Sequence, residues 1–381
     1  MSLWRTKKGN NMIRVLHINA GSGIFGGVSA FCLNIYRNID RDKVQFDFLT
    51  PDKTTYGQYR EEITRYGGNV YEFGIGVRSS SGKIKFTKRL KEFLKDHPYD
   101  IIHINSGILS FNYIVANACK MYSNSKVFVH SHSNGGRSKA REMLSGILKQ
   151  LLVKRADCLL ACSVSSAEYV FPLKAVSKTE IIDNGIDTQR FRYDPAVRES
   201  MRNLLQLNGK YVIGHVGSFT IQKNHEYLIE IFSKVKEKNA DSILLLVGEG
   251  PLLTHIQEMS EAKGLADSVK FLGARKDVSD FYQAMDVFVL PSVFEGFGIV
   301  NIEAQTAGLK CVTSTVVPKN VDVTGNVVQV SLDASIDLWV KEILNKSVER
   351  RDYSNVVKEQ GFDIKTSSDK LTLLYEEALR K

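Results

Sequence analysis

The segment PSVFEGFGIVNIEAQTAG, from Pro291 to Gly308, decides the fold of this chain. Apolar residues predict a strand over Asp286–Leu290 that ends at the proline, and the chain then turns through Gly296 and Gly298 into a segment with helical spacing. In a strand–turn–helix unit, the free N–H groups of the first helical turn point beyond the end of the strand, and they attract anions. Glycines in the turn allow an anion to approach the backbone closely. The segment therefore predicts a phosphate-binding turn.

Two carboxylates bracket this turn. Glu295 precedes the predicted helix and Glu303 lies within it, with seven residues between them. Without a functional role, Glu295 would be an exposed acid and Glu303 an acid on the surface of the helix. A phosphate site with two acids suits a ligand that has phosphates at one end and hydroxyls on either side, such as a nucleotide sugar.

The rest of the chain alternates predicted strands and helices in two successive series. Strands are predicted over 13–19, 44–49, 69–73, 100–105, 126–130, 157–161 and 180–183, and again over 211–216, 243–247, 269–272, 287–290, 310–313 and 327–330. Alternation of this kind is typical of doubly wound α/β domains, and 381 residues are too many for one ordinary core. We predict a Rossmann-like domain over 12–190 and a second over 191–364, with a polar linker that runs to about Gly209. A final helix is predicted within 365–381. It could join either domain, and we predict that it packs against the first.

The composition is that of a globular protein without a membrane span. Hydrophobic residues make up 43% of the chain and charged residues 24%. No apolar run approaches the roughly 18 residues of a transmembrane helix, and the first residues lack the apolar segment of a signal peptide. The five cysteines have neither zinc nor redox spacing, which favours free thiols in a reducing cytoplasm.

The net charge of +9 comes from 51 basic and 42 acidic residues. Basic residues gather in Lys83–Lys95 and Arg137–Arg155, where apolar residues recur at helical spacing. Two interpretations remain open: helices that cover a sheet and expose a solvated basic face, or peripheral docking to an anionic membrane. Nucleic acid is not predicted as a partner, because no aromatic residues interleave with the charge.

A glycine-rich segment, GSGIFGG, follows the first predicted strand. Gly21, Gly23 and Gly26 have the G-x-G-x-x-G spacing of a dinucleotide site. A dehydrogenase would need an acid at the tip of the second strand, which ends in Thr50-Pro51 instead. The alternatives are a loop that contacts a diphosphate, with Gly26 and Gly27 opening the next helix, and a tight structural turn.

The segment HSHSNGG begins at His130, at the end of the fifth predicted strand. Strand alternation would place His130 and His132 on one face. The pair could contribute to a metal site, but the sequence shows no third ligand, so no metal is predicted. Hydrogen bonding of His132 to a sugar hydroxyl or a phosphate is preferred over a structural role, which is expected more for His130.

The matching turn in the second series is GSFTIQKNH. It contains Gly217, Ser218 and Lys223, and the lysine stands just before a helix. An ammonium beside a helix N-terminus is suited to a diphosphate, although a lone lysine is more often solvated. Further on, Arg275 in GARKDV is expected beside a nucleotide base.

Together these motifs resemble the retaining nucleotide-sugar glycosyltransferases of glycosyltransferase family 4. The resemblance is carried by the two spaced glutamates, by GSFTIQKN and IDNGIDTQRF, and by the early glycine pair. HSHSN and KNHEYLIEIF are closest to bacterial capsule and exopolysaccharide members. The resemblance implies the GT-B fold, in which two Rossmann-like domains face each other across a cleft that holds the ligand.

The resemblance also implies roles for individual residues. Glu295 would contact the donor sugar, His132 would stand near the anomeric carbon, and Lys223 would grip the diphosphate, so these three would be catalytic. Glu303 would hold the ribose. The residues that would complete the donor site are Gly26, Gly27, Gly217, Ser218, Arg275, Phe297, Gly298 and Ile299.

The implied reaction is metal-independent transfer of a hexose from a donor that is expected to be UDP-linked. No cofactor is implied beyond that nucleotide sugar. The implied acceptor is a glycan or lipid-linked glycan, used in surface polysaccharide biosynthesis at the cytoplasmic face of the membrane.

The sequence departs from the family at two positions. Ser218 stands where many members have arginine, and Lys319-Asn320 replaces a glycine-rich turn. Other activities also remain open: a sugar-nucleotide epimerase, for which catalytic acids are lacking, a phosphorylase, for which no pyridoxal lysine is identified, and a non-catalytic nucleotide-sugar-binding subunit.

Overall fold

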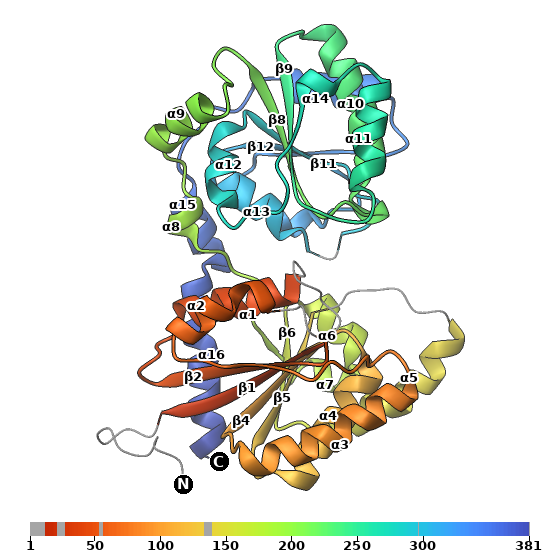
Figure 1. Cartoon of the computed structure of the whole chain (residues 1–381), viewed down its shortest axis with the longest axis vertical. Helices are drawn as coiled ribbons and strands as arrows, with labels where there is room; N and C mark the ends of the chain where they lie inside the picture. Colours follow the sequence, from red (N-terminus) through yellow and green to blue (C-terminus); the bar gives the residue numbers. More distant parts are fainter. Residues whose placement is uncertain (1–11, 21–26, 53–55, 133–138, 296, 381) are drawn as a thin grey trace. The chain divides into compact units, whose positions relative to one another are not determined.

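The computed structural model describes residues 12–20, 27–52, 56–132, 139–295 and 297–380, with the side chains of 139–144 excepted. The chain divides into two compact units (Figure 1). Unit 1 comprises residues 1–185 and 364–381, and unit 2 comprises 186–363. The division falls five residues before the predicted boundary at 190, and the C-terminal helix belongs to unit 1.

Unit 1 is built on a parallel sheet of seven strands in the order β3-β2-β1-β4-β5-β6-β7. Its strands are β1 Ile13–Ala20, β2 Val44–Thr50, β3 Val70–Glu72, β4 Ile101–Ser106, β5 Lys126–Ser131, β6 Cys158–Ala161 and β7 Glu180–Ile181. The central strands are almost continuously buried, as expected for a parallel sheet covered on both faces.

Helices cover both faces of this sheet (Figure 1). They are α1 Gly27–Asn38, α2 Arg60–Arg65, α3 Ser80–Asp96, α4 Leu109–Tyr122, α5 Lys139–Val153, α6 Val164–Val170, α7 Leu173–Val176 and α16 Ile364–Arg380, with a 3₁₀ turn η1 at Gly57–Tyr59. Helices α1 and α16 share one core with alternate residues such as Val15, and α3 and α4 share the other with residues such as Leu16. Residues 364–380 thus return to the first sheet as the last helix of the chain.

Unit 2 repeats this plan with a parallel sheet of six strands in the order β10-β9-β8-β11-β12-β13. Its strands are β8 Tyr211–Val216, β9 Ser242–Val247, β10 Val269–Phe271, β11 Val287–Leu290, β12 Lys310–Ser314 and β13 Val327–Val330. Its helices are α8 Thr188–Phe191, α9 Pro195–Leu204, α10 His225–Lys238, α11 Leu253–Ala262, α12 Val278–Ala284, α13 Ile299–Thr306, α14 Ile336–Leu344 and α15 Ser354–Val357. Short turns η2 Ile221–Lys223, η3 Ala266–Ser268, η4 Lys319–Val321 and η5 Lys358–Phe362 complete it.

The prediction of a linker up to Gly209 is wrong. Residues 186–209 belong to unit 2, where helix α9 packs against α12. Arg198 and Arg202 of α9 reach Asp286, at 2.5 and 3.2 Å, and also donate to backbone carbonyls at the end of α12. The segment resembled a linker because charged and polar residues outnumber apolar ones in it, although Val197, Met201 and Leu205 recur at helical spacing and pack into the core of unit 2.

Strand order reverses at one point in each sheet. The reversal lies between β1 and β4 in unit 1 and between β8 and β11 in unit 2. In doubly wound sheets, ligands bind at the carboxyl ends of the strands at this point, because the following loops turn to opposite faces and leave a crevice. The loop from Gly217 to Lys223 and the loop from Pro291 to Gly298 flank this position in unit 2.

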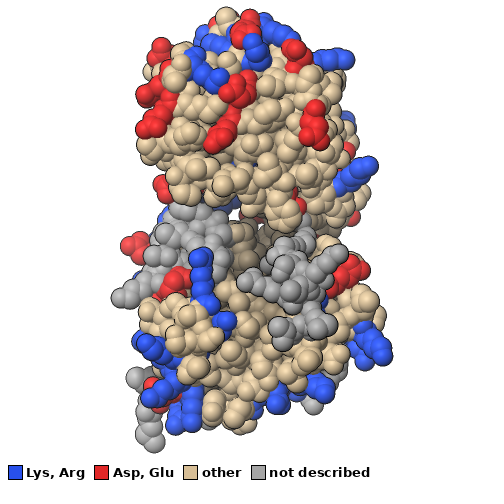
Figure 2. All heavy atoms as spheres, turned by 90° about the vertical axis from the view of Figure 1, so that its right-hand side faces the viewer, with Lys and Arg blue, Asp and Glu red and all other residues tan. Residues whose placement is uncertain are grey.

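The two units carry different charge. Unit 1 has 31 Lys and Arg against 18 Asp and Glu, and unit 2 has 20 against 24, so that the formal +9 divides into +13 and −4. Lys and Arg predominate on unit 1 in the view of Figure 2. Among the described residues, no helix is long and apolar enough to cross a bilayer.

Candidate active site

The loops after β8 and β11 bring Lys223 and Glu295 together. The Lys223 ammonium lies 2.6 Å from Glu295 Oε2, and both side chains are largely buried, with 12% and 9% exposed. The loops are also joined directly, since Val293 N donates to Gln222 O at 2.9 Å and Asn224 Nδ2 donates to Pro291 O at 3.1 Å. Two residues that are 72 positions apart thus form one ion pair at the carboxyl edge of the sheet.

Local backbone geometry directs Lys223 to this position. Asn224 adopts a left-handed conformation (φ 55°, ψ 47°), which ends the turn η2 and lets α10 begin at once. Gly217 lies beneath the lysine stem: a Cβ there would lie 3.2 Å from Lys223 Cγ and Cδ. The glycine predicted at the end of β8 therefore makes room for the lysine.

Glu295 is held on one oxygen only. Oε2 accepts the lysine and also Ser292 Oγ at 3.2 Å, and Ser292 is in turn fixed by Ser314 Oγ, which donates to its carbonyl at 2.6 Å. Within the described part of the chain, Oε1 accepts no hydrogen bond. The carboxylate therefore has a fixed position and one free acceptor oxygen.

Helix α13 begins beside this ion pair. Its N-cap, Gly298, has φ 79°, where an L-residue would be strained, and a Cβ there would lie 3.2 Å from Glu295 Cγ. No side chain of the described residues caps the helix, so the first-turn N–H groups of Ile299 and Val300 remain available to a ligand. Phe297 packs on Phe362, with ring centroids 5.6 Å apart. Gly296 lies outside the described residues.

Glu303 lies further along the same helix. Burial raises its pKa to about 7, against the opposing influence of a hydrogen bond from Tyr282 and of the positive charges of Arg190 and Lys223. The Tyr282 hydroxyl donates to Oε2 at 2.9 Å. Glu303 thus stands near its ionisation point, close to both Lys223 and Arg190.

Sequence reasoning missed Tyr282 and Arg190. Arg190 lies in α8 and is anchored by the carbonyl of Lys276 and by Ser279 Oγ at 3.4 Å. It is part of the segment NGIDTQRF, which contributed to the family resemblance but was assigned to a linker. Tyr282 lies in an apolar helical pattern and had no signal that distinguished it from a core residue.

The remaining predicted donor residues of unit 2 lie in a layer of linked turns. Gly217 N donates to Val247 O at 3.0 Å, Phe219 N to Glu249 O at 3.0 Å, and Gly248 N to Gly273 O at 2.9 Å. Ser218 is exposed in this layer. Arg275 is also exposed, and its guanidinium pairs with Asp277 at 3.0 Å and lies over Phe281. Its expected position beside a base stays a prediction.

In unit 1 the sequence-predicted His132 joins a row of buried imidazoles. His130 and His132 lie on one face, with ring centroids 4.0 Å apart, and both contact Phe31 of α1. His130 Nδ1 lies 3.3 Å from His103 Nε2, and His103 Nδ1 lies 2.6 Å from the Tyr375 hydroxyl of α16. Burial lowers the pKa of each of these histidines, that of His132 to about 3, so the row is uncharged at neutral pH.

The glycine loop of unit 1 falls mostly outside the described residues. Gly21, Gly23 and Gly26 are among those not described, and Gly27 is the first residue of α1, with open space where a Cβ would stand. The described residues contain no group of three or more His, Cys, Asp or Glu that could hold a metal ion. The prediction of metal-independent chemistry is a separate matter and stays a prediction.

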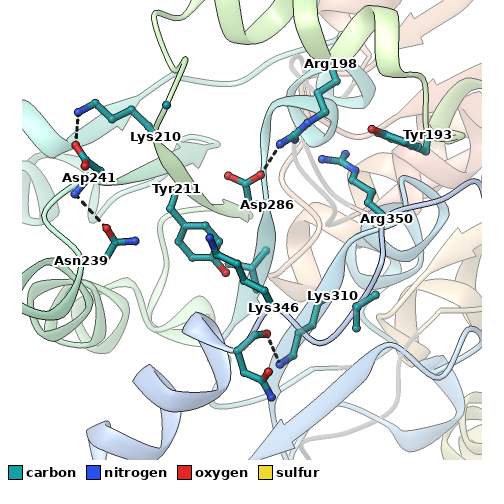
Figure 3. Close-up of a pocket in the computed structure, with 14 residues that line it drawn as sticks. Tyr193, Arg198, Lys210, Tyr211, Asn239, Asp241, Asp286, Lys310, Lys346 and Arg350 are labelled. Carbon is teal, nitrogen blue, oxygen red and sulfur yellow. Dashed lines mark hydrogen bonds and ion pairs between the residues drawn. The ribbon is translucent and has the colours of Figure 1, made fainter.

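A cavity of about 460 Å³ lies at the opposite, amino edge of the unit 2 sheet (Figure 3). Its basic side chains Arg350 and Lys310 form hydrogen bonds that stabilise the fold. Arg350 donates to the carbonyls of Tyr282, Gln283 and Ala307 at 2.8 to 3.0 Å, and Lys310 donates to Glu342 O and Asn345 O at 2.8 and 3.1 Å. These carbonyls end helices α12, α13 and α14, where cations satisfy unpaired acceptors. The cavity is thus distinct from the site around Lys223.

Family models match both halves of the chain. The model for "Glycosyltransferase Family 4" matches residues 25–190, and that for "Glycosyl transferases group 1" matches 197–359. The putative glycosyltransferase EpsF of Bacillus subtilis is 28% identical over 97% of both chains. The Escherichia coli UDP-Gal:alpha-D-GlcNAc-diphosphoundecaprenol alpha-1,3-galactosyltransferase is 28% identical over 81% of both chains.

Solved structures share the fold. Anabaena HepE, crystallised in complex with UDP and glucose, is 19% identical and has a TM-score of 0.75 over 96% of this chain and 100% of its own. The chain therefore belongs to the GT-B glycosyltransferases of the family 4 type, as its motifs predicted. Its class of activity is glycosyl transfer in polysaccharide or glycolipid biosynthesis.

Proposed function

We propose that this glycosyltransferase moves a hexose from a UDP-linked donor, with retention at the anomeric carbon and without a metal ion, to a lipid-linked glycan in surface polysaccharide biosynthesis. The observation that carries the proposal is the Lys223–Glu295 pair beside the uncapped first turn of α13. A donor screen tests the proposal.

The pair and the helix suit a diphosphate. An ammonium has three N–H donors, and Lys223 uses one of them for Glu295 among the described residues. The others remain for phosphate oxygens, next to the first-turn amides of α13, where the helix dipole favours negative charge. Such fixed donors stabilise the charge that develops on a departing diphosphate. This support makes a metal ion unnecessary in the proposed reaction.

The carboxylates suit hydroxyl groups. Glu295 offers Oε1 to the donor sugar, and Glu303, with Tyr282 beside it, offers an acceptor for the ribose hydroxyls. His132 would meet the donor near the anomeric carbon. We assign no covalent nucleophile: the charge of Glu295 is compensated by Lys223 at 2.6 Å, which weakens the carboxylate as a nucleophile. Retention would follow from attack on the face of the leaving group, with the departing phosphate taking the acceptor's proton.

The names of relatives support the donor and the acceptor. HepE was crystallised with UDP and glucose, and the Escherichia coli relative uses UDP-Gal and a diphosphoundecaprenol-linked acceptor. A polyprenol-linked acceptor would place the enzyme at the inner face of the cytoplasmic membrane.

Basic helices of unit 1 support peripheral membrane contact. Helix α3 buries Phe86, Leu90 and Leu94 against the core and exposes Lys85, Lys88 and Lys95. On the second basic helix, α5, Ile147 and Leu151 are 67% and 37% exposed, while Leu152 is buried. Exposed apolar residues next to lysines suit a bilayer surface.

The experiment is a screen of purified enzyme against UDP-, GDP- and ADP-linked sugars, with membrane extract as the acceptor source. Binding is measured by calorimetry, and product is measured by transfer of radiolabelled sugar to lipid. A UDP-hexose that binds and is transferred with its anomeric configuration retained supports the proposal. Binding without transfer would favour a non-catalytic subunit, conversion without acceptor would favour an epimerase, and an EDTA-sensitive rate would contradict metal independence.

A further inference from the structure

Asn105, at the carboxyl end of β4, contacts two histidines of unit 1, His17 and His132. The residue is fully buried. Its Nδ2 lies 3.1 Å from His17 Nδ1 and 3.2 Å from the backbone oxygen of His103. Its Oδ1 lies 3.1 Å from Nε2 of His132. One side chain therefore makes three polar contacts at the edge of the sheet.

The backbone contact decides which way the amide points. A carbonyl oxygen only accepts hydrogen bonds, so the amide atom that faces His103 O must be the nitrogen. The oxygen of Asn105 then faces His132, and because it only accepts, Nε2 of His132 must carry the proton. The lone pair of the His132 ring consequently lies on Nδ1.

Neighbouring groups keep His132 in this form. The ring is packed between His130 and Phe31, with centroids 4.0 and 5.1 Å away. Among the described residues of unit 1, the titratable groups beside the ring are His17, His103 and His130, whose pKa values are all lowered by burial, so none of these three brings a charge at neutral pH. The described residues offer no hydrogen-bond partner to Nδ1, and His132 as a residue is partly exposed.

We propose that Asn105 is a positioning residue that holds His132 as the Nε2–H tautomer, so that Nδ1 accepts a hydrogen bond from a substrate hydroxyl. This inference rests on the proposed function, in which His132 meets the donor. The sequence left two partners open for His132, a sugar hydroxyl and a phosphate, and the tautomer distinguishes between them. A phosphate oxygen brings no proton at neutral pH and would face a lone pair, whereas a hydroxyl donates.

The tautomer is tested directly by NMR. In protein with ¹⁵N-labelled histidine, long-range ¹H–¹⁵N correlations show which ring nitrogen carries the proton, and the His132→Gln variant assigns the signals. We expect the Nε2–H form at pH 7, with no titration above pH 5. An Nδ1–H form or an imidazolium at pH 7 would overturn the proposal. The measurement needs no substrate, so it decides the tautomer even if the proposed transfer reaction is not found.

The Asn105→Asp variant tests the positioning role. Its carboxylate would still accept from Nε2–H but would favour the imidazolium, which has no lone pair on Nδ1. We expect the NMR signals of His132 to titrate in this variant, and its kcat/KM relative to wild type to rise about tenfold from pH 6 to pH 8. Asn105→Leu should lower kcat/KM about tenfold at every pH, since one hydrogen bond to the ring is lost.

Asn112→Asp is the matched control. Asn112 is a buried asparagine of α4 in the same unit, and it donates to Ser106 O at 2.9 Å, away from the histidine row. Its variant should show a pH-independent ratio to wild type. A pH-independent ratio for Asn105→Asp as well, or a His132 that still fails to titrate in it, would show that Asn105 serves only the fold.

Discussion

The carboxyl edges of the two sheets carry opposite kinds of chemistry. In unit 2, Lys223 pairs with Glu295 and Glu303 stands near its ionisation point, so the edge is built from charges. In unit 1, His132 follows the end of β5 and lies against the buried His103 and His130, and all three are uncharged at neutral pH. Two sheets with the same parallel plan thus differ in the groups that they offer to a ligand.

Burial and the neighbouring charges together explain why the protonation states differ between the two units. A buried imidazole without an anionic partner gives up its proton, whereas a buried carboxylate keeps its charge only where a cation compensates it. Described lysines that are exposed on α3, such as Lys85, Lys88 and Lys95, carry positive charge at the surface of unit 1, whereas the histidine row carries none at neutral pH. A charged ligand group suits the unit 2 edge, and hydroxyls suit the unit 1 edge.

The largest expected effect is that acid opens unit 1 before unit 2. His17, His103, His130 and His132 of unit 1 have pKa values well below 6.5, so below pH 6.5 the unfolded chain takes up protons that the folded chain does not. Each such histidine removes about 1 kcal/mol from the free energy of unfolding between pH 6.5 and 5.5. Unit 1 should therefore lose about 4 kcal/mol.

Unit 2 has two such histidines, and it also has an acid whose effect on stability changes with pH in the opposite direction. His215 and His225 have pKa values lowered to about 4 and about 2. The pKa of Glu303 is raised to about 7, so its contribution to stability recovers as the pH falls from 7 towards 4.5. Hydrogen exchange of the intact chain, followed by mass spectrometry, should show strands β4 and β5 opening first. An exposed control, His255→Gln, should behave as wild type, and earlier opening of β8 would contradict the comparison.

Removal of the Lys223 ammonium should slow the reaction strongly. Lys223→Ala is expected to lower kcat/KM at least a hundredfold, because loss of one preorganised donor costs about 3 kcal/mol of barrier. Steady-state kinetics with the donor from the screen measure this. Lys234→Ala, on the exposed side of α10, is the matched control. In the double variant Lys223→Ala/Glu295→Gln, the acid that has lost its cation is neutralised as well, and this variant should remain slow. A near-normal kcat/KM for the double variant would show that Lys223 takes no part in the mechanism.

Donor binding should depend on the ionisation of Glu303. If the carboxylate accepts ribose hydroxyls, the Kd of the nucleotide sugar should fall about tenfold from pH 6 to pH 8, since the pKa lies at about 7. Binding should release protons near pH 6.5, which calorimetry in two buffers detects. Glu303→Gln should abolish the dependence and the exposed Glu258→Gln should keep it. Equal pH profiles for wild type and Glu303→Gln would place the acid outside the donor site.

The smallest expected effect concerns the surface charge of unit 1. Lys88→Ala on α3 should weaken binding to vesicles with anionic lipid about fivefold, since each lysine near such a surface contributes about 1 kcal/mol. Co-sedimentation at low and high salt measures this. Lys238→Ala, exposed on α10 of unit 2, should have no effect. If the two variants bind alike, the basic helices are solvated faces only.

Several features of the site were predictable from the sequence because they depend on local patterns. Strand–turn–helix signals located the turn before α13 and the lysine before α10, and glycines marked places where backbone or side chains approach closely. Alternation along β5 placed His130 and His132 on one face. Arg190 and Tyr282 were missed because neither lies in a turn, and a core tyrosine gives no separate signal.

Two parallel α/β units, the family and the residue types at the strand ends were predictable from the sequence, because apolar periodicity and turn chemistry are local. The contacts between distant residues became visible only in the folded chain: Lys223 with Glu295, Glu303 with Tyr282, and Asn105 with His132. The tertiary structure also decided their protonation, because burial and neighbouring charges shift a pKa and neither can be read along the chain.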